Sequence, residues 1–307
     1  KLSRNRERDL RMKLTSVGPH RDDFCVKVNG IDIRRYGSQG QQRTAALSLK
    51  LSEIELVKEL IHDLKKVLPQ VRIWMGGPEA SYDAVHLMDE LPEVELIMQG
   101  EGEETFTRLV EACECGTEVC FSELPGIVLR CFDGTIEVHR PAPLMNLDDI
   151  PFSYGDLSGL EHRIIYYESS RGCPFSCSYC LSSIDKKVRF RSLPLVTREL
   201  QFFLDRKVPQ VKFVDRTFNC KKSHSMAIWQ YLLEHDNGIT NFHFEISSDL
   251  LDDDELALMK QMRPGLIQLE IGVQTTNLVV VKEIRRTMDL DKVARRVAQV
   301  NAFGNIH

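Results

Sequence analysis

Three cysteines lie close together in the middle of the chain, at Cys173, Cys177 and Cys180, in the pattern Cys-x3-Cys-x2-Cys. Thiolates are the soft ligands that iron–sulfur clusters require, and this spacing lets one loop wrap around a corner of a cubane cluster. A four-iron cluster needs four ligands, so three cysteines leave one iron open. Because an open iron can bind and reduce a substrate, the pattern predicts a reactive cluster rather than a simple electron carrier.

Two simpler interpretations of these thiols are a zinc loop and a chance grouping of cysteines. The surroundings favour a cluster, since the cysteines follow a strand predicted at 164–168, and Arg171-Gly172 turns the chain out of that strand into the loop. The chain holds nine cysteines, an odd number at irregular spacing, which argues against a complete disulfide framework. Cys113, Cys115 and Cys120 lack the partners that complete a zinc site, so we expect ordinary thiols there.

Composition is that of an ordinary globular protein, with 307 residues, 42% hydrophobic and 28% charged. No apolar run approaches the roughly 20 residues of a membrane span, and no signal-peptide core precedes the first elements, so we expect a cytoplasmic protein. The first 50 residues carry 12 Lys and Arg against 5 Asp and Glu, although the whole chain has a net charge of −5. This basic segment suits either a nucleic-acid contact or a solvated basic helix.

Strands alternating with helices are predicted on both sides of the cysteine loop. Downstream, apolar strands at 211–214, 242–246 and 266–271 indicate a parallel β/α barrel, in which functional residues gather at the carboxyl ends of strands. Upstream, strands at 71–75 and 94–98 each lead into a glycine turn and a helix, which is typical of a doubly wound parallel sheet. Ligands bind such sheets at the carboxyl ends of the strands, where these glycine turns lie.

Local residue patterns predict a further helix and two hairpin turns. A long helix with Leu47, Leu51, Ile54 and Ile61 on one stripe is predicted to end at Leu68, before Pro69. Asn29-Gly30 and Asp133-Gly134 each predict a hairpin turn between short strands.

The cysteine loop and the elements after it resemble the radical S-adenosylmethionine (SAM) superfamily. The resemblance implies that Cys173, Cys177 and Cys180 hold a [4Fe–4S] cluster whose open iron binds the amino and carboxylate groups of SAM. It implies further that an electron from a reductant such as ferredoxin or flavodoxin cleaves SAM to methionine and a 5′-deoxyadenosyl radical. That radical would abstract hydrogen from a small-molecule or other substrate.

The same resemblance implies roles for five polar or aromatic residues. Tyr179 takes the aromatic position before the last cysteine, and Asp215 lies where the family contacts the methionine amino group. Glu245 lies in a position used for ribose or amine contacts, and Glu270 and Gln274 match a pattern near the cofactor and substrate. Each of the polar residues is equally suited to be a loop cap or a helix start.

Residues 58–123 resemble the second half of the cobalamin-binding domain that precedes many radical SAM domains, through the turns at Gly76-Gly77-Pro78-Glu79 and Gly100-Glu101-Gly102. The resemblance implies cobalamin at Gly76, Gly77 and Gly100, and methyl transfer as the reaction that cobalamin supports. Two features depart from the family: the first half of the domain is replaced, and no Asp-x-His-x-x-Gly motif supplies a cobalt ligand. The simpler interpretation of the glycines is tight turns that need positive φ.

Residues of about 10–57 resemble the C-terminal part of RecF, a DNA-repair ATPase related to ABC proteins, through the signature segment Gly37-Ser38-Gln39-Gly40-Gln41. A turn of this kind before a helix can bind phosphate. The chain contains no Gly-Lys dipeptide, so the phosphate-binding loop of such ATPases is absent and autonomous ATP hydrolysis is not expected. The alternatives to a radical SAM enzyme are therefore a RecF-like fragment that binds DNA and ATP, and a non-enzymatic metal-binding protein.

We predict an α/β chain in four segments. These are a RecF-like fragment (1–57), a partial cobalamin-binding-like domain (58–123), a hairpin and linker (124–158) and a truncated radical SAM barrel (159–307). The truncation is inferred because the chain ends where a fifth barrel strand should begin. We expect a fusion of two unrelated coding regions, with its seam in the helix between Val57 and Leu60.

Overall fold

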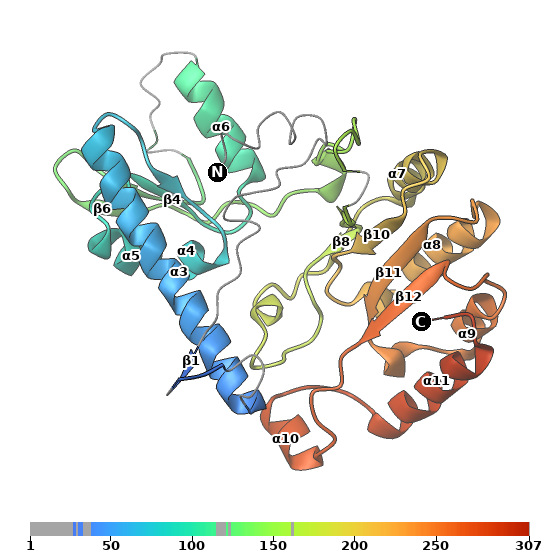
Figure 1. Cartoon of the computed structure of the whole chain (residues 1–307). Helices are drawn as coiled ribbons and strands as arrows, with labels where there is room; N and C mark the ends of the chain where they lie inside the picture. Colours follow the sequence, from blue (N-terminus) through green and yellow to red (C-terminus); the bar gives the residue numbers. More distant parts are fainter. Residues whose placement is uncertain are drawn as a thin grey trace, which may run out of the picture. The chain divides into compact units, whose positions relative to one another are not determined.

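The computed structural model describes residues 27–28, 30–32, 38–114, 121, 124–160 and 163–306 (Figure 1). The chain divides into two compact units, Lys1–Pro143 and Leu144–His307. The features predicted at Cys25, Gly37, Cys115 and Cys120 lie outside the described residues.

The first unit contains a four-stranded sheet of order β3-β4-β5-β6, built from Trp74–Met75, Leu96–Met98, Ile127–Arg130 and Ile136–Val138. Strands β3 and β4 are parallel, whereas β5 and β6 run antiparallel to their neighbours. The helices are α3 (Gln39–Val67), α4 (Pro78–Tyr82), α5 (Ala84–Glu90) and α6 (Glu103–Glu114). The alternation of parallel strands and helices predicted for residues 71–109 is present, and an antiparallel hairpin extends the sheet.

Local sequence explains the ends of these elements. Helix α3 stops at Val67, one residue before the predicted end at Leu68, and Pro69 follows. The turn between β5 and β6 is closed by Asp133, whose carboxylate accepts hydrogen bonds from the Thr135 amide at 3.0 Å and hydroxyl at 2.7 Å. A second hairpin joins β1 (Lys27–Val28) and β2 (Ile31–Asp32) next to Gly30, whose φ of 80° favours glycine.

Two details of the first unit differ from the prediction. The strand predicted at 71–75 is shortened to Trp74–Met75. The single helix predicted after the first glycine turn is split into α4 and α5 at Asp83, whose φ of −128° is not helical. The small core of this unit is formed by Met88, Val94 and Ile97, which are fully buried.

The second unit is built on a parallel sheet of order β12-β11-β10-β7. Its strands are β7 (Ile165–Tyr167), β10 (Gln210–Phe213), β11 (Asn241–Ile246) and β12 (Ile267–Ile271), and a short antiparallel pair joins β8 (Ser170–Arg171) to β9 (Arg189–Phe190). The helices are α7 (Leu193–Asp205), α8 (Lys222–Glu234), α9 (Asp253–Met259), α10 (Leu278–Glu283) and α11 (Leu290–Phe303). The predicted alternation of parallel strands and helices is confirmed, and the four strands form an open sheet within the described residues.

The two faces of this sheet have different side chains. Along β11, Phe242, Phe244 and Ile246 are buried, whereas the alternate residues His243 and Glu245 are only partly buried. The buried face is rich in aromatic rings that pack with α7, α8 and α9 in one hydrophobic core (Figure 1). Burying one such large apolar side chain contributes roughly 1.5–3 kcal/mol, so this face anchors the unit. The other face carries the polar residues of the candidate site.

The segment predicted as a linker is held firmly at its end in the second unit. The buried guanidinium of Arg191 donates to the carbonyls of Leu147 at 2.6 Å and Ile150 at 2.9 Å. Arg191 also pairs with Glu199 at 2.6 Å, and Glu199 accepts a hydrogen bond from Tyr167 at 2.7 Å. A buried charge pair satisfied in this way fixes residues 147–150 against the start of the sheet.

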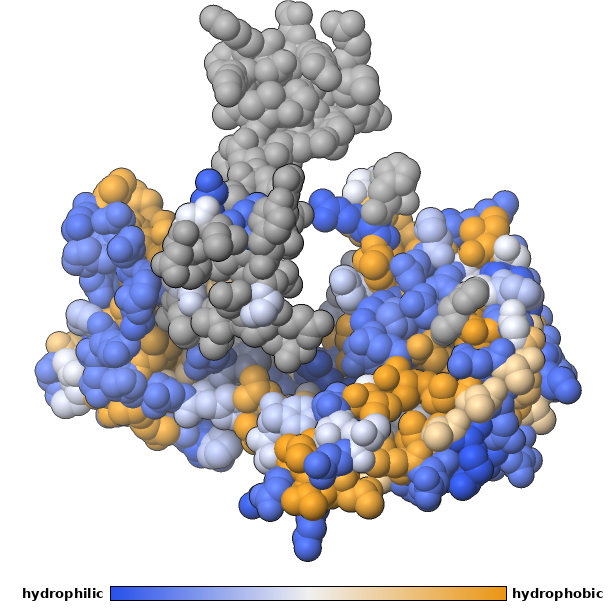
Figure 2. Space-filling view, turned by 60° about the horizontal axis from the view of Figure 1, so that its bottom comes forward, coloured by the Kyte–Doolittle hydropathy of each residue, from blue (hydrophilic) through white to orange (hydrophobic). Residues whose placement is uncertain are grey.

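Polar side chains cover most of the described surface seen in Figure 2, with apolar patches between them. Within the described residues, no helix is both long enough and apolar enough to span a membrane.

Candidate iron–sulfur and cofactor site

The three cysteines lie on one loop, Cys173–Lys187, which we call the cluster loop. Its base is closed by the β8–β9 pair and by a hydrogen bond from the Cys173 amide to the Asp185 carbonyl at 3.0 Å. Gly172 makes this closure possible, because its φ is 97° and a Cβ atom there would lie 2.7 Å from the Lys187 carbonyl oxygen. The Arg171-Gly172 turn noted in the sequence is therefore a steric requirement of the loop.

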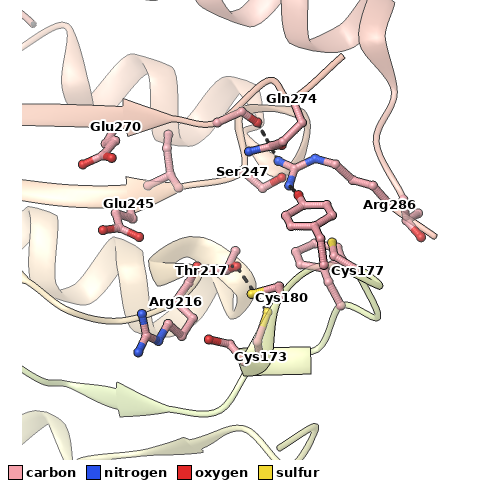
Figure 3. Close-up of a pocket in the computed structure, with 16 residues that line it drawn as sticks. Cys173, Cys177, Cys180, Arg216, Thr217, Glu245, Ser247, Glu270, Gln274 and Arg286 are labelled. Atoms are coloured by element: carbon pink, nitrogen blue, oxygen red, sulfur yellow. Dashed lines mark hydrogen bonds between the residues drawn. The ribbon is translucent and has the colours of Figure 1, made fainter. Parts of the chain in front are cut away.

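The thiols of Cys173, Cys177 and Cys180 line a single cavity of about 260 Å³ (Figure 3). Cys173 and Cys177 are buried, Cys180 is partly buried, and all three are free thiols. Among the described residues, no three Cys, His, Asp or Glu side chains converge on a point as they would around a single metal ion. The thiols are instead spread along the cavity wall, and three soft donors around one space match the ligand chemistry of a cubane cluster.

The cysteines have a polar neighbour in the turn after β10. The Thr217 hydroxyl lies 3.7 Å from the Cys173 sulfur and donates a hydrogen bond to the Arg216 carbonyl at 2.8 Å. Hydrogen bonds to ligand sulfurs are one of the means by which proteins tune cluster potentials. Because the Thr217 hydroxyl proton is given to Arg216, the contact with Cys173 is one in which the thiol donates to the Thr217 oxygen.

Two carboxylates from adjacent strands line the cavity as well. Glu245 on β11 and Glu270 on β12 are direct partners in the sheet register, and their side chains lie side by side in Figure 3. Lys212 on β10 is 2.9 Å from Glu270 and 3.4 Å from Glu245. The hydrogen bond from Lys212 lowers the pKa of Glu270 and raises that of Lys212, so these two side chains form an ion pair at neutral pH.

His243 adjoins this charged group, with its Nε2 3.1 Å from the Glu270 carboxylate. Burial and, next, the charge of Lys212 lower the pKa of His243, which keeps the imidazole neutral at physiological pH. The ionised Glu270 therefore lies between the ammonium of Lys212 and a neutral imidazole.

Asp215 does not line the cavity; it is completely buried at the end of β10. Its carboxylate accepts hydrogen bonds from the Ser169 amide at 3.0 Å, the Ser169 hydroxyl at 2.8 Å and the Ser170 hydroxyl. Burial raises the pKa of Asp215 to about 6, although these hydrogen bonds oppose the shift. The observed contacts of Asp215 are thus with the strand that leads into the cluster loop.

His224 on α8 completes this buried network. Its Nε2 is 3.2 Å from the Ser169 hydroxyl, and burial lowers its pKa to about 4. The imidazole packs on Phe190 with ring centroids 4.8 Å apart, so it connects helix α8 to the base of the cluster loop.

The cavity brings together seven of the residues selected from the sequence. These are Cys173, Cys177, Tyr179, Cys180, Glu245, Glu270 and Gln274. Sequence reasoning missed Lys212 behind the glutamates. It also missed six polar residues that line the cavity, namely Ser182, Arg216, Thr217, Ser247, Arg286 and Thr287. Arg216 and Thr217 directly follow Asp215 and could have been found from that position, whereas Arg286 carries no local motif.

The glycines selected for cobalamin lie in the other unit, at turns after β3 and β4. Gly77 and Gly100 have φ values of 92° and 73°, and no atom lies within 4 Å of a Cβ built on either. A Cβ on Gly76 would lie 3.3 Å from the end of the Met98 side chain. Positive φ accounts for two of the three glycines without a ligand, and the space beside them is open.

Comparison with known proteins identifies relatives for both parts of the sequence. Residues 167–305 match the sequence profile of the Radical SAM superfamily. A RecF protein of Lachnoclostridium phytofermentans is 65% identical over 63 residues, which are 20% of this chain and 18% of that protein. A RecF protein of Agathobacter rectalis is 45% identical over 108 residues, 35% of this chain and 29% of that protein. The predicted resemblance to RecF is confirmed, and it covers a fragment of that protein.

Two solved structures share the fold over most of the chain. The cobalamin-dependent SAM radical enzyme OxsB, solved with aqua-cobalamin and SAM, matches with a TM-score of 0.65 and 18% identity over 90% of this chain and 43% of its own. The radical SAM methyltransferase TsrM from Kitasatospora setae, solved with tryptophan and a SAM analogue, matches with a TM-score of 0.64 and 15% identity. That match covers 81% of this chain and 51% of TsrM, so the chain spans about half or less of either structure.

The profile match and the shared fold agree with the cysteine pattern and with the parallel sheet that positions it. Residues 167–305 of this chain form a radical SAM domain.

Proposed function

We propose that this chain binds a [4Fe–4S] cluster through Cys173, Cys177 and Cys180 and uses it to cleave SAM reductively. The observation that carries the proposal is that three thiols of one loop and the polar ends of two parallel strands line the same cavity. When bound, such a cluster supplies an electron to SAM, which breaks into methionine and a 5′-deoxyadenosyl radical.

The residues around the cavity suit the charges of SAM. Its methionine portion carries an ammonium, a carboxylate and a sulfonium, so a complementary site needs both signs of charge. Glu245 and Glu270 supply carboxylates, while Arg216 supplies a guanidinium group on the same cavity. Lys212 keeps Glu270 ionised, which preserves an acceptor for cationic groups of SAM.

The protein also shields this chemistry from solvent. Cys173 and Cys177 are buried, so a cluster held there is protected on the side of the loop. Proteins that use reactive cofactors exclude water and oxygen from them. The electron must come from an external reductant of the ferredoxin or flavodoxin class, and dithionite can replace it in an assay.

We extend the proposal to cobalamin at the turns of Gly76, Gly77 and Gly100. The two turns follow adjacent parallel strands, which is the edge where ligands bind α/β sheets, and OxsB, which shares this fold, was solved with aqua-cobalamin. A bound cobalamin would make methyl transfer the matching class of reaction. The test is the visible spectrum of the chain after incubation with hydroxocobalamin and desalting.

The test of the radical SAM activity is an assay for 5′-deoxyadenosine by liquid chromatography. The full chain is reconstituted anaerobically with iron and sulfide, and then given SAM and dithionite. We expect 5′-deoxyadenosine and methionine in equal amounts, and none from Cys177→Ala, because that variant loses a cluster ligand.

Cys131→Ala is the matched control, since Cys131 lies in the β5–β6 hairpin of the other unit and does not line the cavity. It should behave as the wild type. A wild-type chain that takes up iron but forms no 5′-deoxyadenosine would contradict the proposed activity, and one that takes up no iron would contradict the cluster as well.

A further inference from the structure

Two segments that are far apart in the sequence meet along the cavity wall: the cluster loop and residues 284–287, which follow α10. The Ser178 amide donates to the Ile284 carbonyl at 2.9 Å. Arg286 donates from Nη1 to the Tyr179 hydroxyl at 2.8 Å and from Nη2 to the Gly272 carbonyl at 2.6 Å (Figure 3). Because Gly272 directly follows β12, one guanidinium joins the cluster loop to the end of a sheet strand.

The direction of Arg286 is set by the way α10 ends. The Arg286 amide bonds to the Val281 carbonyl at 3.1 Å, and the Arg285 amide bonds to the Lys282 carbonyl at 3.0 Å. This pair of bonds is the Schellman motif, which requires a left-handed residue just after the helix. Arg285 occupies that position with a φ of 51°, a region that non-glycine residues rarely adopt. The turn is therefore defined by backbone bonds, and it leads the chain back toward the cluster loop.

The guanidinium of Arg286 is committed to protein acceptors. Both Nη atoms bind neutral groups of the chain, the Tyr179 hydroxyl and the Gly272 carbonyl. Its Nε is buried and has no hydrogen-bond partner among the described residues. Because its charge-assisted hydrogen bonds go to the protein's own loop and strand, Arg286 stabilises the conformation of the cavity wall.

We propose that Arg286 is a positioning residue that fixes Tyr179, and with it the segment between Cys177 and Cys180, against the end of β12. Tyr179, Gly272 and Arg286 all line the cavity, so this contact fixes the distance between the cluster loop and the end of β12 at the cavity wall. The benefit to SAM rests on the proposed function, whereas the positioning itself is a property of the cluster-free protein.

The first test measures hydrogen–deuterium exchange by mass spectrometry on the cluster-free full chain. In Arg286→Met, we expect peptides of the cluster loop to exchange about tenfold faster, because the charge-assisted bonds to Tyr179 and Gly272 are lost. Peptides from β10 and α7 should be unchanged. Arg286→Lys keeps a single charged donor and should give an intermediate rate, and Arg285→Gly, which preserves the turn, should exchange no faster than the wild type.

The second test measures SAM cleavage by the reconstituted variants. Arg286→Met should bind as much iron as the wild type but show a KM for SAM about tenfold higher, with a smaller change in kcat and partial rescue by Arg286→Lys. A KM equal to that of the wild type would overturn the role toward SAM.

If the cluster loop exchanges at the same rate in Arg286→Met as in the wild type, the positioning role is overturned. An equal rise in exchange over the whole chain would overturn it too, because Arg286 would then stabilise the fold in general. If the wild-type chain fails to cleave SAM, the proposed function fails, and the exchange measurement still decides the positioning role.

Discussion

The buried pair of Asp215 and His224 shows how single residues support a cysteine loop that they do not touch. Both contact Ser169, four residues before the first cysteine, and both are titratable groups without a solvent-exposed side chain. Burial penalises the charged form of each, and it therefore raises the pKa of the carboxyl and lowers that of the imidazole. The contributions of the two residues to the unfolding free energy therefore change in opposite directions with pH.

The imidazole makes the folded state sensitive to acid. The pKa of His224 is about 4 in the folded chain, below the unfolded value of about 6.5. The unfolded chain takes up a proton between these values that the folded chain does not, so the contribution of His224 is lost as the pH falls through this window. We expect the excess unfolding free energy of the wild type over His224→Gln to shrink by about 3 kcal/mol from pH 6.5 to pH 4 in urea titrations.

Asp215 should show the opposite sign. Its folded pKa of about 6 lies above the unfolded value of about 3.9, so its contribution is present at low pH and lost as the pH rises toward 6. The stability of the wild type relative to Asp215→Asn should therefore fall by about 2 kcal/mol from pH 4 to pH 6. Differences that change in the same direction for both variants would contradict the assignment of these pKa values.

The candidate site was predicted from the cysteine spacing and from the resemblance to the radical SAM superfamily. Glu245 and Glu270 were selected because they match positions of that resemblance, and both line the cavity. Asp215 was selected in the same way, but its carboxylate is occupied by Ser169 and Ser170, a contact over more than 40 residues that no local pattern reveals. Arg286 was missed because it meets Tyr179 from 107 positions away.

At the scale of elements, two helices of the second unit end in the same strained way. After α7, Lys207 has a φ of 54°, and the amides of Lys207 and Val208 bond to the carbonyls of Leu204 and Phe203. Arg285 has the same place after α10. Both are Schellman motifs with a charged residue where glycine is usual, and a left-handed residue with a Cβ costs about 1–2 kcal/mol.

Glycine at either position should therefore stabilise the protein. Allowing for the larger entropy of glycine in the unfolded chain, we expect a gain of roughly 0.5–1 kcal/mol for Lys207→Gly and for Arg285→Gly, adding in the double variant. Urea unfolding measures the change. Glu283→Gly, in the last turn of α10, is the control and should destabilise by up to about 1 kcal/mol; if all three variants lose stability, the strain assigned to the two left-handed residues is wrong.

The sequence predicted these elements well where apolar patterns were strong. Strands β10, β11 and β12 each have buried residues on the face toward the helices, and their predicted positions agree with the structure within one residue. The shortening of the predicted strand at 71–75 to β3 and the break at Asp83 were not foreseen, since the exact length of a strand and one non-helical φ leave little trace in composition. The antiparallel pairing of β4 with β5 depends on tertiary contacts and was also not anticipated.

At the scale of the whole molecule, the chain joins sequence related to two different proteins. Helix α3 runs without interruption from Gln39 to Val67, across the predicted seam between Val57 and Leu60. The RecF relatives match a fragment, whereas the radical SAM profile covers most of the second unit. The chemistry we propose for the molecule therefore belongs to the second unit, where all residues of the cavity lie.

The central claim is that three thiols of one loop hold a cluster whose remaining iron is open to SAM. It is tested most directly by low-temperature electron paramagnetic resonance of the reconstituted, dithionite-reduced full chain, recorded with and without SAM. We predict about four irons per chain and the signal of a reduced [4Fe–4S] cluster, which changes when SAM is added because SAM binds the open iron. A cluster signal that SAM leaves unaltered, or a signal of equal intensity in Cys177→Ala, would contradict the claim.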